Sequence, residues 1–322
     1  MGETSYGVPG RVTPLAEGLW MIDLGFQERE TVVTAYLIQQ GDALVLVETG
    51  PSSTLAHLLA GIRTAGFNPN DLTNIFVSHI HLDHSGAAGV FLRDHAPRAV
   101  VHVHPVGLPH LVDPSKLVAS AGRLYTDRMD ELWGEVAPVQ EDRVIPVVDD
   151  EPVHIGGLDL VPIFTPGHAS HHIVLWDPAR KVAFTGDVGG VRMPSMTFNL
   201  PPCPPPEVNP EAWAQSAERM RGLSAERLCL THGGCFDDVS AHLAQLEPNI
   251  AALTEVAKTG LLAEEDHETL TARIHDWVAG QAGPIDPEVL VNLEWASPSY
   301  LASLGLTRLL VKRGVVIPHT PA

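Results

Sequence analysis

Four side chains that can bind a metal ion occur within six residues of this chain, in the run HIHLDH at residues 79–84. The run directly follows a short apolar segment that is typical of a buried strand. Because side chains two residues apart in an extended segment point the same way, we expect His79 and His81 to converge where the strand ends. Asp83 and His84 then fall on the turn into the next helix. A tetrahedral ion usually draws its ligands from separated segments, so four ligands in so short an arc predict two neighbouring metal ions.

Three further candidate ligands each follow a predicted strand and have glycine close by, which suits tight turns. In layered α/β folds the ends of neighbouring strands line one edge, where sites form. We therefore expect all seven side chains to lie at one edge. The three are His168 after residues 158–164, Asp187 after residues 182–185, and His232 after residues 227–230.

The first half of the chain alternates strand-like and helical patterns, which predicts an α/β layer arrangement. Residues 113–133 are expected to be helical. Beyond about residue 247, apolar residues at helical spacing predict amphipathic helices. We therefore expect a catalytic domain over residues 1–247 and a helical region over residues 248–322.

The charged residues argue against some classes of partner. The chain has 322 residues, with 20 Lys+Arg against 39 Asp+Glu and a net charge of −19. Neutralising phosphate groups needs a basic surface, so the charge argues against nucleic acid and anionic membranes. No run approaches the roughly 18 apolar residues of a membrane span. The N-terminus has no apolar segment of signal-peptide length, and a cytoplasmic location is expected.

The cysteines give no sign of a disulfide framework. There are three, an odd number with no CxxC pair: Cys203, Cys229 and Cys235. In a cytoplasmic protein this pattern predicts reduced thiols.

The residues and their order resemble the metallo-β-lactamase-fold superfamily, whose hallmark is HxHxDH followed by single His, Asp and His ligands. The matching scaffold covers about residues 15–245. Glu48-Thr49-Gly50 resembles the Asp-Thr-Gly turn of the family, with Glu in place of Asp. The resemblance implies a four-layer αββα sandwich of the metallo-β-lactamase fold, here with a C-terminal helical appendage.

The resemblance also implies which ligand serves which metal ion. The expected ligands of the first ion are His79, His81 and His168. Those of the second ion are Asp83, His84 and His232, and Asp187 is expected to bind both ions.

Neutral imidazoles and two carboxylates leave two divalent ions with residual positive charge. This charge lowers the pKa of a bridging water, so that hydroxide forms near neutral pH. The expected reaction is attack of this hydroxide on the carbonyl carbon of a carboxylic ester, thioester or lactone, with Asp83 passing a proton to the leaving group. Zinc is the default metal, and Fe or Mn also suits His and Asp ligands.

Two features bear on the substrate. The chain is similar to glyoxalase II, but residues 248–322 carry five basic side chains against nine acidic ones, which argues against the anionic S-lactoylglutathione. Quorum-quenching lactonases share the site, and their apolar acyl substrates fit better. The loop after Asp187 is apolar and suits such a group. The candidate pocket residues are Met193, Met196, Phe198, His171 and His172.

Alternative functions stay open on the same ligands. Persulfide dioxygenases look similar but use a single iron, on the positions of His79, His168 and Asp187. A phosphodiesterase or nuclease of this fold is disfavoured by the charge, and β-lactam cleavage by the missing signal peptide. A metal-binding module without catalysis is a further alternative. The expected partner is a small-molecule substrate, and the apolar helices would also suit a homodimer.

Overall fold

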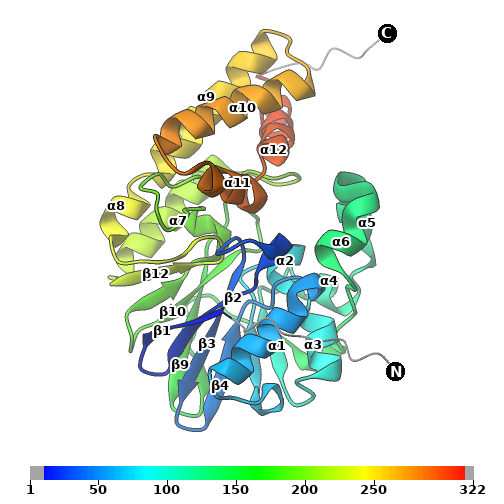
Figure 1. Ribbon diagram of the computed structural model, residues 1–322, viewed down its shortest axis with the longest axis vertical. Helices are drawn as coiled ribbons and strands as arrows, with labels where there is room; N and C mark the ends of the chain where they lie inside the picture. Colours follow the sequence, from blue (N-terminus) through cyan, green and yellow to red (C-terminus); the bar gives the residue numbers. More distant parts are fainter. Residues whose placement is uncertain (1–10, 316–322) are drawn as a thin grey trace. The chain divides into compact units, whose positions relative to one another are not determined.

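The first sheet contains the strands β1 (Arg11–Ala16), β2 (Leu19–Asp23), β3 (Thr34–Gln40), β4 (Ala43–Val47), β5 (Asn74–Phe76), β6 (Val100–Val103) and β7 (Val144–Pro146). They follow one another across the sheet in chain order (Figure 1). β1 to β4 pair antiparallel, and β4 to β7 pair parallel. All five residues of β4 are buried, whereas the edge strand β1 is largely exposed. The continuous apolar run of β4 is typical of a strand covered on both faces.

Six helices accompany this sheet: α1 (Leu55–Thr64), α2 (Leu82–Ser85), α3 (Ala88–Asp94), α4 (Leu108–Val112), α5 (Ser115–Tyr125) and α6 (Met129–Trp133). α1 buries Leu58, Leu59 and Ile62, the stripe expected from helical spacing. The helical prediction for residues 113–133 is confirmed by α5 and α6, with a break between them. Thr126 has φ 48° and ψ −115°, outside the helical region, so α5 ends there.

The second sheet contains β8 (Val153–Ile155), β9 (Leu158–Phe164), β10 (Ile173–Asp177), β11 (Val182–Phe184), β12 (Arg227–Leu230) and β13 (Gly234–Phe236). β8 and β9 form an antiparallel hairpin. β11 pairs parallel with β12, which pairs antiparallel with the edge strand β13.

The computed structural model describes residues 11–315, and the chain forms two compact units. The first unit ends at Ile163 and also includes Leu175–Arg180. The second unit comprises Phe164–Val174 and the chain from Lys181 onward. The ligands expected at residues 79–84 therefore belong to the first unit, and the other three belong to the second.

The helices of the second unit are α7 (Pro210–Gly222), α8 (Val239–Leu243), α9 (Leu246–Leu262), α10 (His267–Ala282), α11 (Pro287–Ala296) and α12 (Ser299–Lys312). α9, α10 and α12 pack against one another and bury apolar side chains such as Leu253, Ile274 and Leu306. Gly305 lets α12 approach the Pro-rich loop at residues 201–206 closely. A Cβ at this position would lie only 2.1 Å from the carbonyl oxygen of Cys203. The α/β class and the helical C-terminal region are thus confirmed.

Two expectations about the chain as a whole stay predictions. The boundary after residue 247 falls in the first turn of α9, and the cytoplasmic location is untested. Among residues 11–315, no helix is both long and apolar enough to cross a membrane.

The expectation of reduced thiols is wrong for two of the three cysteines. Cys229 in β12 and Cys235 in β13 form a disulfide. The two residues lie directly opposite each other in the antiparallel pair, with 4.2 Å between their Cα atoms. The short spacing hid this pairing, because it depends on a tight hairpin turn between the two strands.

Candidate metal centre

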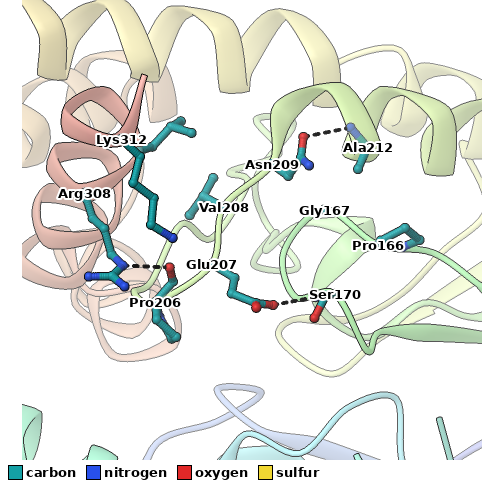
Figure 2. A pocket seen from close by; sticks show the side chains of 11 residues that line it. Pro166, Gly167, Ser170, Pro206, Glu207, Val208, Asn209, Ala212, Arg308 and Lys312 are labelled. Carbon is teal, nitrogen blue, oxygen red and sulfur yellow. Dashed lines mark hydrogen bonds between the residues drawn. The ribbon is translucent and has the colours of Figure 1, made fainter. Parts of the chain in front are cut away.

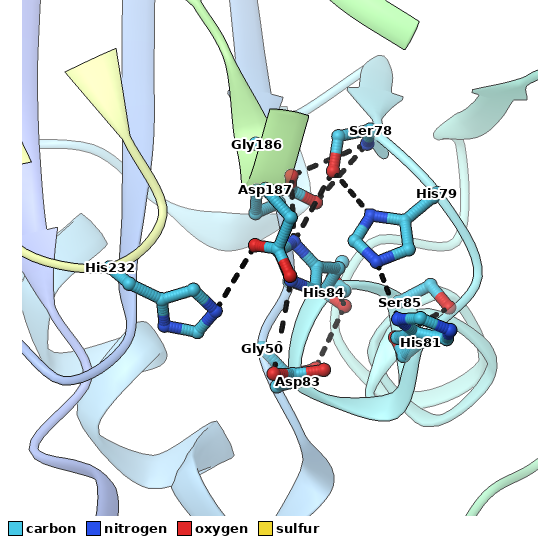
Figure 3. A network of polar contacts seen from close by, with 12 residues as sticks. Gly50, Ser78, His79, His81, Asp83, His84, Ser85, Gly186, Asp187 and His232 are labelled. Atoms are coloured by element: carbon cyan, nitrogen blue, oxygen red, sulfur yellow. Dashed lines mark hydrogen bonds and ion pairs between the residues drawn. The ribbon is translucent and has the colours of Figure 1, made fainter. Parts of the chain in front are cut away.

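The first half-site is the segment of residues 79–84, between β5 and α2, in the first unit. His79 Nε2 lies 2.8 Å from His81 Nδ1 (Figure 3), and the ring centroids of His79 and His84 are 4.0 Å apart. Asp83 Oδ2 lies 3.8 Å from His84 Nε2. His79 and His84 are fully buried, while His81 and Asp83 are half-buried. The short motif therefore gathers its four ligand side chains in one place.

Glu48 supports this half-site from the end of β4. Its side chain is 2% exposed, and one carboxylate oxygen lies 3.2 Å from His84 Nδ1. The carboxylate also accepts a hydrogen bond from the backbone N–H of Ser78. Because a carboxylate accepts, His84 Nδ1 carries the proton, and Nε2 offers its lone pair to a metal. The Glu48-Thr49-Gly50 turn thus supports the candidate ligand His84 through the Glu48 carboxylate.

The second half-site lies in the second unit, where three strand ends bring their ligands together. Asp187, in the 3₁₀ turn after β11, places Oδ2 3.3 Å from His168 Nε2. Its Oδ1 lies 3.3 Å from His232 Nε2 (Figure 3). At most 4% of each of the three residues is exposed. One carboxylate oxygen facing each imidazole is the arrangement of a carboxylate that bridges two ions.

Backbone groups hold the second half-site in place. His168 Nδ1 lies 3.0 Å from the carbonyl oxygen of Pro202, so this nitrogen donates and Nε2 is left for a metal. His172 Nε2 accepts hydrogen bonds from the backbone N–H groups of Asp187, at 3.1 Å, and Val188, at 3.3 Å. Its Nδ1 therefore donates to Thr165 Oγ1, 3.0 Å away. His172, a candidate pocket residue, thus supports the backbone of the Asp187 turn, and its place in a substrate pocket stays a prediction.

The loop after Asp187 contains the other expected pocket residues. Met193, Met196 and Phe198 are at most 7% exposed. The ring of Phe198 makes an edge contact with Trp277 of α10, with centroids 5.8 Å apart. Whether these side chains, or His171, line a substrate pocket stays a prediction.

Arg192 fixes this loop, a role that the sequence patterns did not reveal. Its Nε donates to the carbonyl oxygen of Met196 at 2.8 Å, and its Nη1 contacts both carboxylate oxygens of Asp238 at 2.9 Å. The guanidinium carbon lies 4.3 Å from the centroid of the Phe236 ring. The backbone N–H of Arg192 also donates to the carbonyl oxygen of His232, at 3.4 Å. The loop and the His232 turn are thus joined through one residue.

The second unit also contains a surface pocket of about 240 Å³ (Figure 2). Arg308 and Lys312 of α12 line it, and Arg308 Nε donates to the carbonyl oxygen of Pro206. Partial burial alone would raise the pKa of Glu207 in this pocket, but hydrogen bonds from Ser170 and nearby positive charge lower it below its usual value. The remaining lining residues are Pro166, Gly167, Val208, Asn209, Ala212 and Leu309. None of the expected pocket residues is among them.

The two half-sites together supply five imidazoles and two carboxylates. Neutral nitrogen and anionic oxygen donors of this kind suit divalent zinc, iron or manganese. The donor set therefore fits a dinuclear metal site, without deciding which metal it binds.

Comparison with known proteins agrees with this fold and donor set. The family model of the metallo-beta-lactamase superfamily matches residues 29–232, and this chain belongs to that superfamily. A relative from Sulfurisphaera tokodaii, the metallo-beta-lactamase fold-containing protein ST1585, is 28% identical over 236 residues, covering 71% of this chain and 84% of its own. The match spans both units, so the predicted family is confirmed; the glyoxalase II-like or lactonase-like branch is not.

Two solved structures are similar over nearly the whole chain. The metallo-beta-lactamase family protein TTHA1429 from Thermus thermophilus aligns with a TM-score of 0.69 and 21% identity, covering 96% of this chain and 98% of its own. A beta-lactamase domain protein from Burkholderia ambifaria aligns with a TM-score of 0.67 and 17% identity, covering 99% and 94%. The predicted metallo-β-lactamase fold with C-terminal helices is therefore confirmed.

Proposed function

We propose that this protein is a dinuclear-metal hydrolase that cleaves a carboxylic ester, thioester or lactone. The observation that carries the proposal is Asp187, with one carboxylate oxygen 3.3 Å from each of two ligand imidazoles. Membership of the superfamily supports joining the two half-sites into one centre, because the family match spans both units.

In the proposed centre Asp187 would serve both ions. Glu48 and the carbonyl oxygen of Pro202 hold His84 and His168 with Nε2 as the metal-binding nitrogen. The proposed ligands of the first ion are His79, His81 and His168, and those of the second are Asp83, His84 and His232.

Bound metal ions would supply a hydroxide at neutral pH and a Lewis acid for the carbonyl oxygen. Asp83 is the residue that we expect to move a proton. Its side chain is 24% exposed, so it can reach solvent or a leaving group, and it lies 3.8 Å from His84 Nε2. Glu48 is buried and contacts Ser78 and His84, so its place is to support His84.

The proposed substrate is a small molecule with an apolar acyl part. The apolar loop at residues 191–206 begins four residues after Asp187 and supports this class. The net charge of −19 argues against nucleic acid. Zinc is proposed as the metal, with iron or manganese as alternatives.

Metal analysis combined with a substrate screen tests the proposal. We expect two metal ions per chain and oxygen-independent hydrolysis of an ester, thioester or lactone. The persulfide dioxygenase alternative predicts a single iron and oxygen uptake with a persulfide, and that result would overturn the hydrolase. Full metal occupancy with no turnover in the whole screen would favour a metal-binding module.

A further inference from the structure

The disulfide between Cys229 and Cys235 joins the two strands on either side of a short turn. Its flanking cross-strand pairs are Leu228 with Phe236 and Leu230 with Gly234. β13 has three residues and lies at the edge of the sheet, so it pairs with β12 alone. The covalent bond therefore closes a hairpin that few backbone hydrogen bonds hold.

The turn that the disulfide closes carries His232. Gly233, the next residue, has φ +110°, and a Cβ there would lie 1.7 Å from the carbonyl oxygen of Arg192. The turn therefore packs tightly against the Arg192 loop, and His232 Nε2 lies 3.3 Å from Asp187 Oδ1. The hairpin thus carries a candidate metal ligand three residues from Cys229.

We propose that Cys229–Cys235 is a thiol–disulfide exchange site whose reduction by a dithiol loosens the His232 turn and weakens metal binding. The effect on metal rests on the proposed dinuclear centre, whereas the exchange reaction does not.

The exposure of the two sulfur-bearing residues sets the direction of exchange. Cys229 is fully buried, whereas Cys235 is half-buried, so an incoming thiolate reaches Cys235 Sγ. The new bond forms to Cys235, the protein S–S bond breaks, and the Cys229 sulfur leaves and takes up a proton. The second thiol of the reductant then attacks the mixed disulfide at the sulfur of the reductant and releases Cys235 as a thiol. Two electrons and two protons pass to the protein, and the dithiol leaves as its cyclic disulfide.

The third cysteine takes no part in this exchange. Cys203 is 1% exposed, and burial raises the pKa of its thiol to about 12. It therefore stays protonated and is a poor nucleophile. This makes Cys203 a matched internal control for the reactive pair.

The test uses the full-length protein loaded with zinc and kept in oxidised or reduced dithiothreitol, which is then removed without air. Alkylation under denaturing conditions and mass spectrometry identify the free thiols. We expect modification of Cys203 in both samples, and of Cys229 and Cys235 in the reduced sample alone. Chelator competition should show about tenfold weaker binding of one zinc ion after reduction, the size of a lost supporting contact. Amide hydrogen exchange over residues 231–234 should become faster.

Two variants separate the bridge from a general loss of folding. The Cys235→Ser variant should bind zinc as weakly as the reduced parent protein, whether it is kept in oxidised or reduced dithiothreitol. If Cys235→Ser does not fold, Cys235→Ala replaces it. Cys203→Ala should keep the full redox response.

Alkylation of Cys229 and Cys235 in the oxidised sample would overturn the exchange site. Equal zinc affinity and equal hydrogen exchange in both samples would overturn its coupling to the His232 turn. If neither sample binds metal, the proposed metal centre fails. Hydrogen exchange at residues 231–234 then decides alone whether the turn responds to reduction.

Discussion

The two half-sites of the candidate metal centre are built in opposite ways. Residues 79–84 supply four ligands from one short segment, which Glu48 supports through His84. The second half-site takes one ligand from each of three strand ends, up to 64 residues apart, and meets at Asp187. A local motif fixes its own geometry, whereas the second arrangement depends on strand register and on the contacts that hold each loop. The second half-site should therefore be the more easily damaged from a distance.

Replacing Asp187 should reduce metal affinity more than any other change considered, because its carboxylate contacts both imidazoles of the second half-site. For Asp187→Asn we expect the affinity for both metal ions to fall by more than about a hundredfold, beyond the range seen for supporting residues. Hydrolysis should be lost with it. Metal content after dialysis against a chelator measures this effect. Asp237→Asn, a carboxylate of the same unit paired with Arg227, is the control. Loss of only one ion would mean that Asp187 does not bridge.

One buried histidine in each unit predicts sensitivity to acid. Burial lowers the pKa of His102 in the first unit and of His242 in the second from 6.5 to about 4. His102 stacks on Phe76, and its Nδ1 has no acceptor among residues 11–315. The guanidinium of Arg192, 3.4 Å from His242 Nδ1, also opposes protonation of His242.

The direction of the change in stability with pH follows from the protons that the folded and unfolded chains bind. Between pH 6.5 and about 4 the unfolded chain binds a proton at each of these histidines and the folded chain does not. Stability is therefore full above pH 6.5 and is lost as the pH falls toward 4, by about 3 kcal/mol for each histidine. Denaturant unfolding of the metal-free protein at pH 7 and pH 4.5 measures the loss. His102→Gln and His242→Gln should each reduce it, with His275→Gln on α10 as the control. An unchanged pH dependence in both variants would contradict the prediction.

Glu48 offers a direct test of the local half-site. Glu48→Gln keeps the shape but removes the charge that holds His84 Nδ1–H, so we expect the affinity of one metal ion to fall by about tenfold. Glu48→Asp keeps the charge and should retain more of the affinity. Competition titration with a chelator measures both variants. Equal affinity in Glu48→Gln and the parent would show that His84 needs no carboxylate.

All seven candidate ligand residues could be named from the sequence, because each lies in a motif or beside a predicted strand end. The contacts that hold these residues in place could not be predicted. The acceptor for His168 is a backbone carbonyl, which leaves no side-chain signature. The Cys229–Cys235 pair depends on the register of a hairpin with a three-residue strand. Likewise, the break between α5 and α6 lies in the backbone of Thr126, where the apolar spacing continues without interruption. The sequence thus does not predict the long-range arrangement on which the second half-site depends.

The smallest expected effect concerns the pocket lined by Arg308 and Lys312. The proposed substrate has an apolar acyl part, so neither cation is needed to bind it. For Lys312→Gln we expect kcat/KM toward a neutral ester or lactone to change by less than about twofold, since an exposed, screened charge contributes little to the binding of an uncharged substrate. Lys258→Gln, an exposed lysine on α9, is the matched control. Paired assays with a neutral substrate and an acidic analogue of the same acyl group would sharpen the result. A rise in KM confined to the acidic analogue would show that the second unit selects its substrate by charge, and the apolar class would then be wrong.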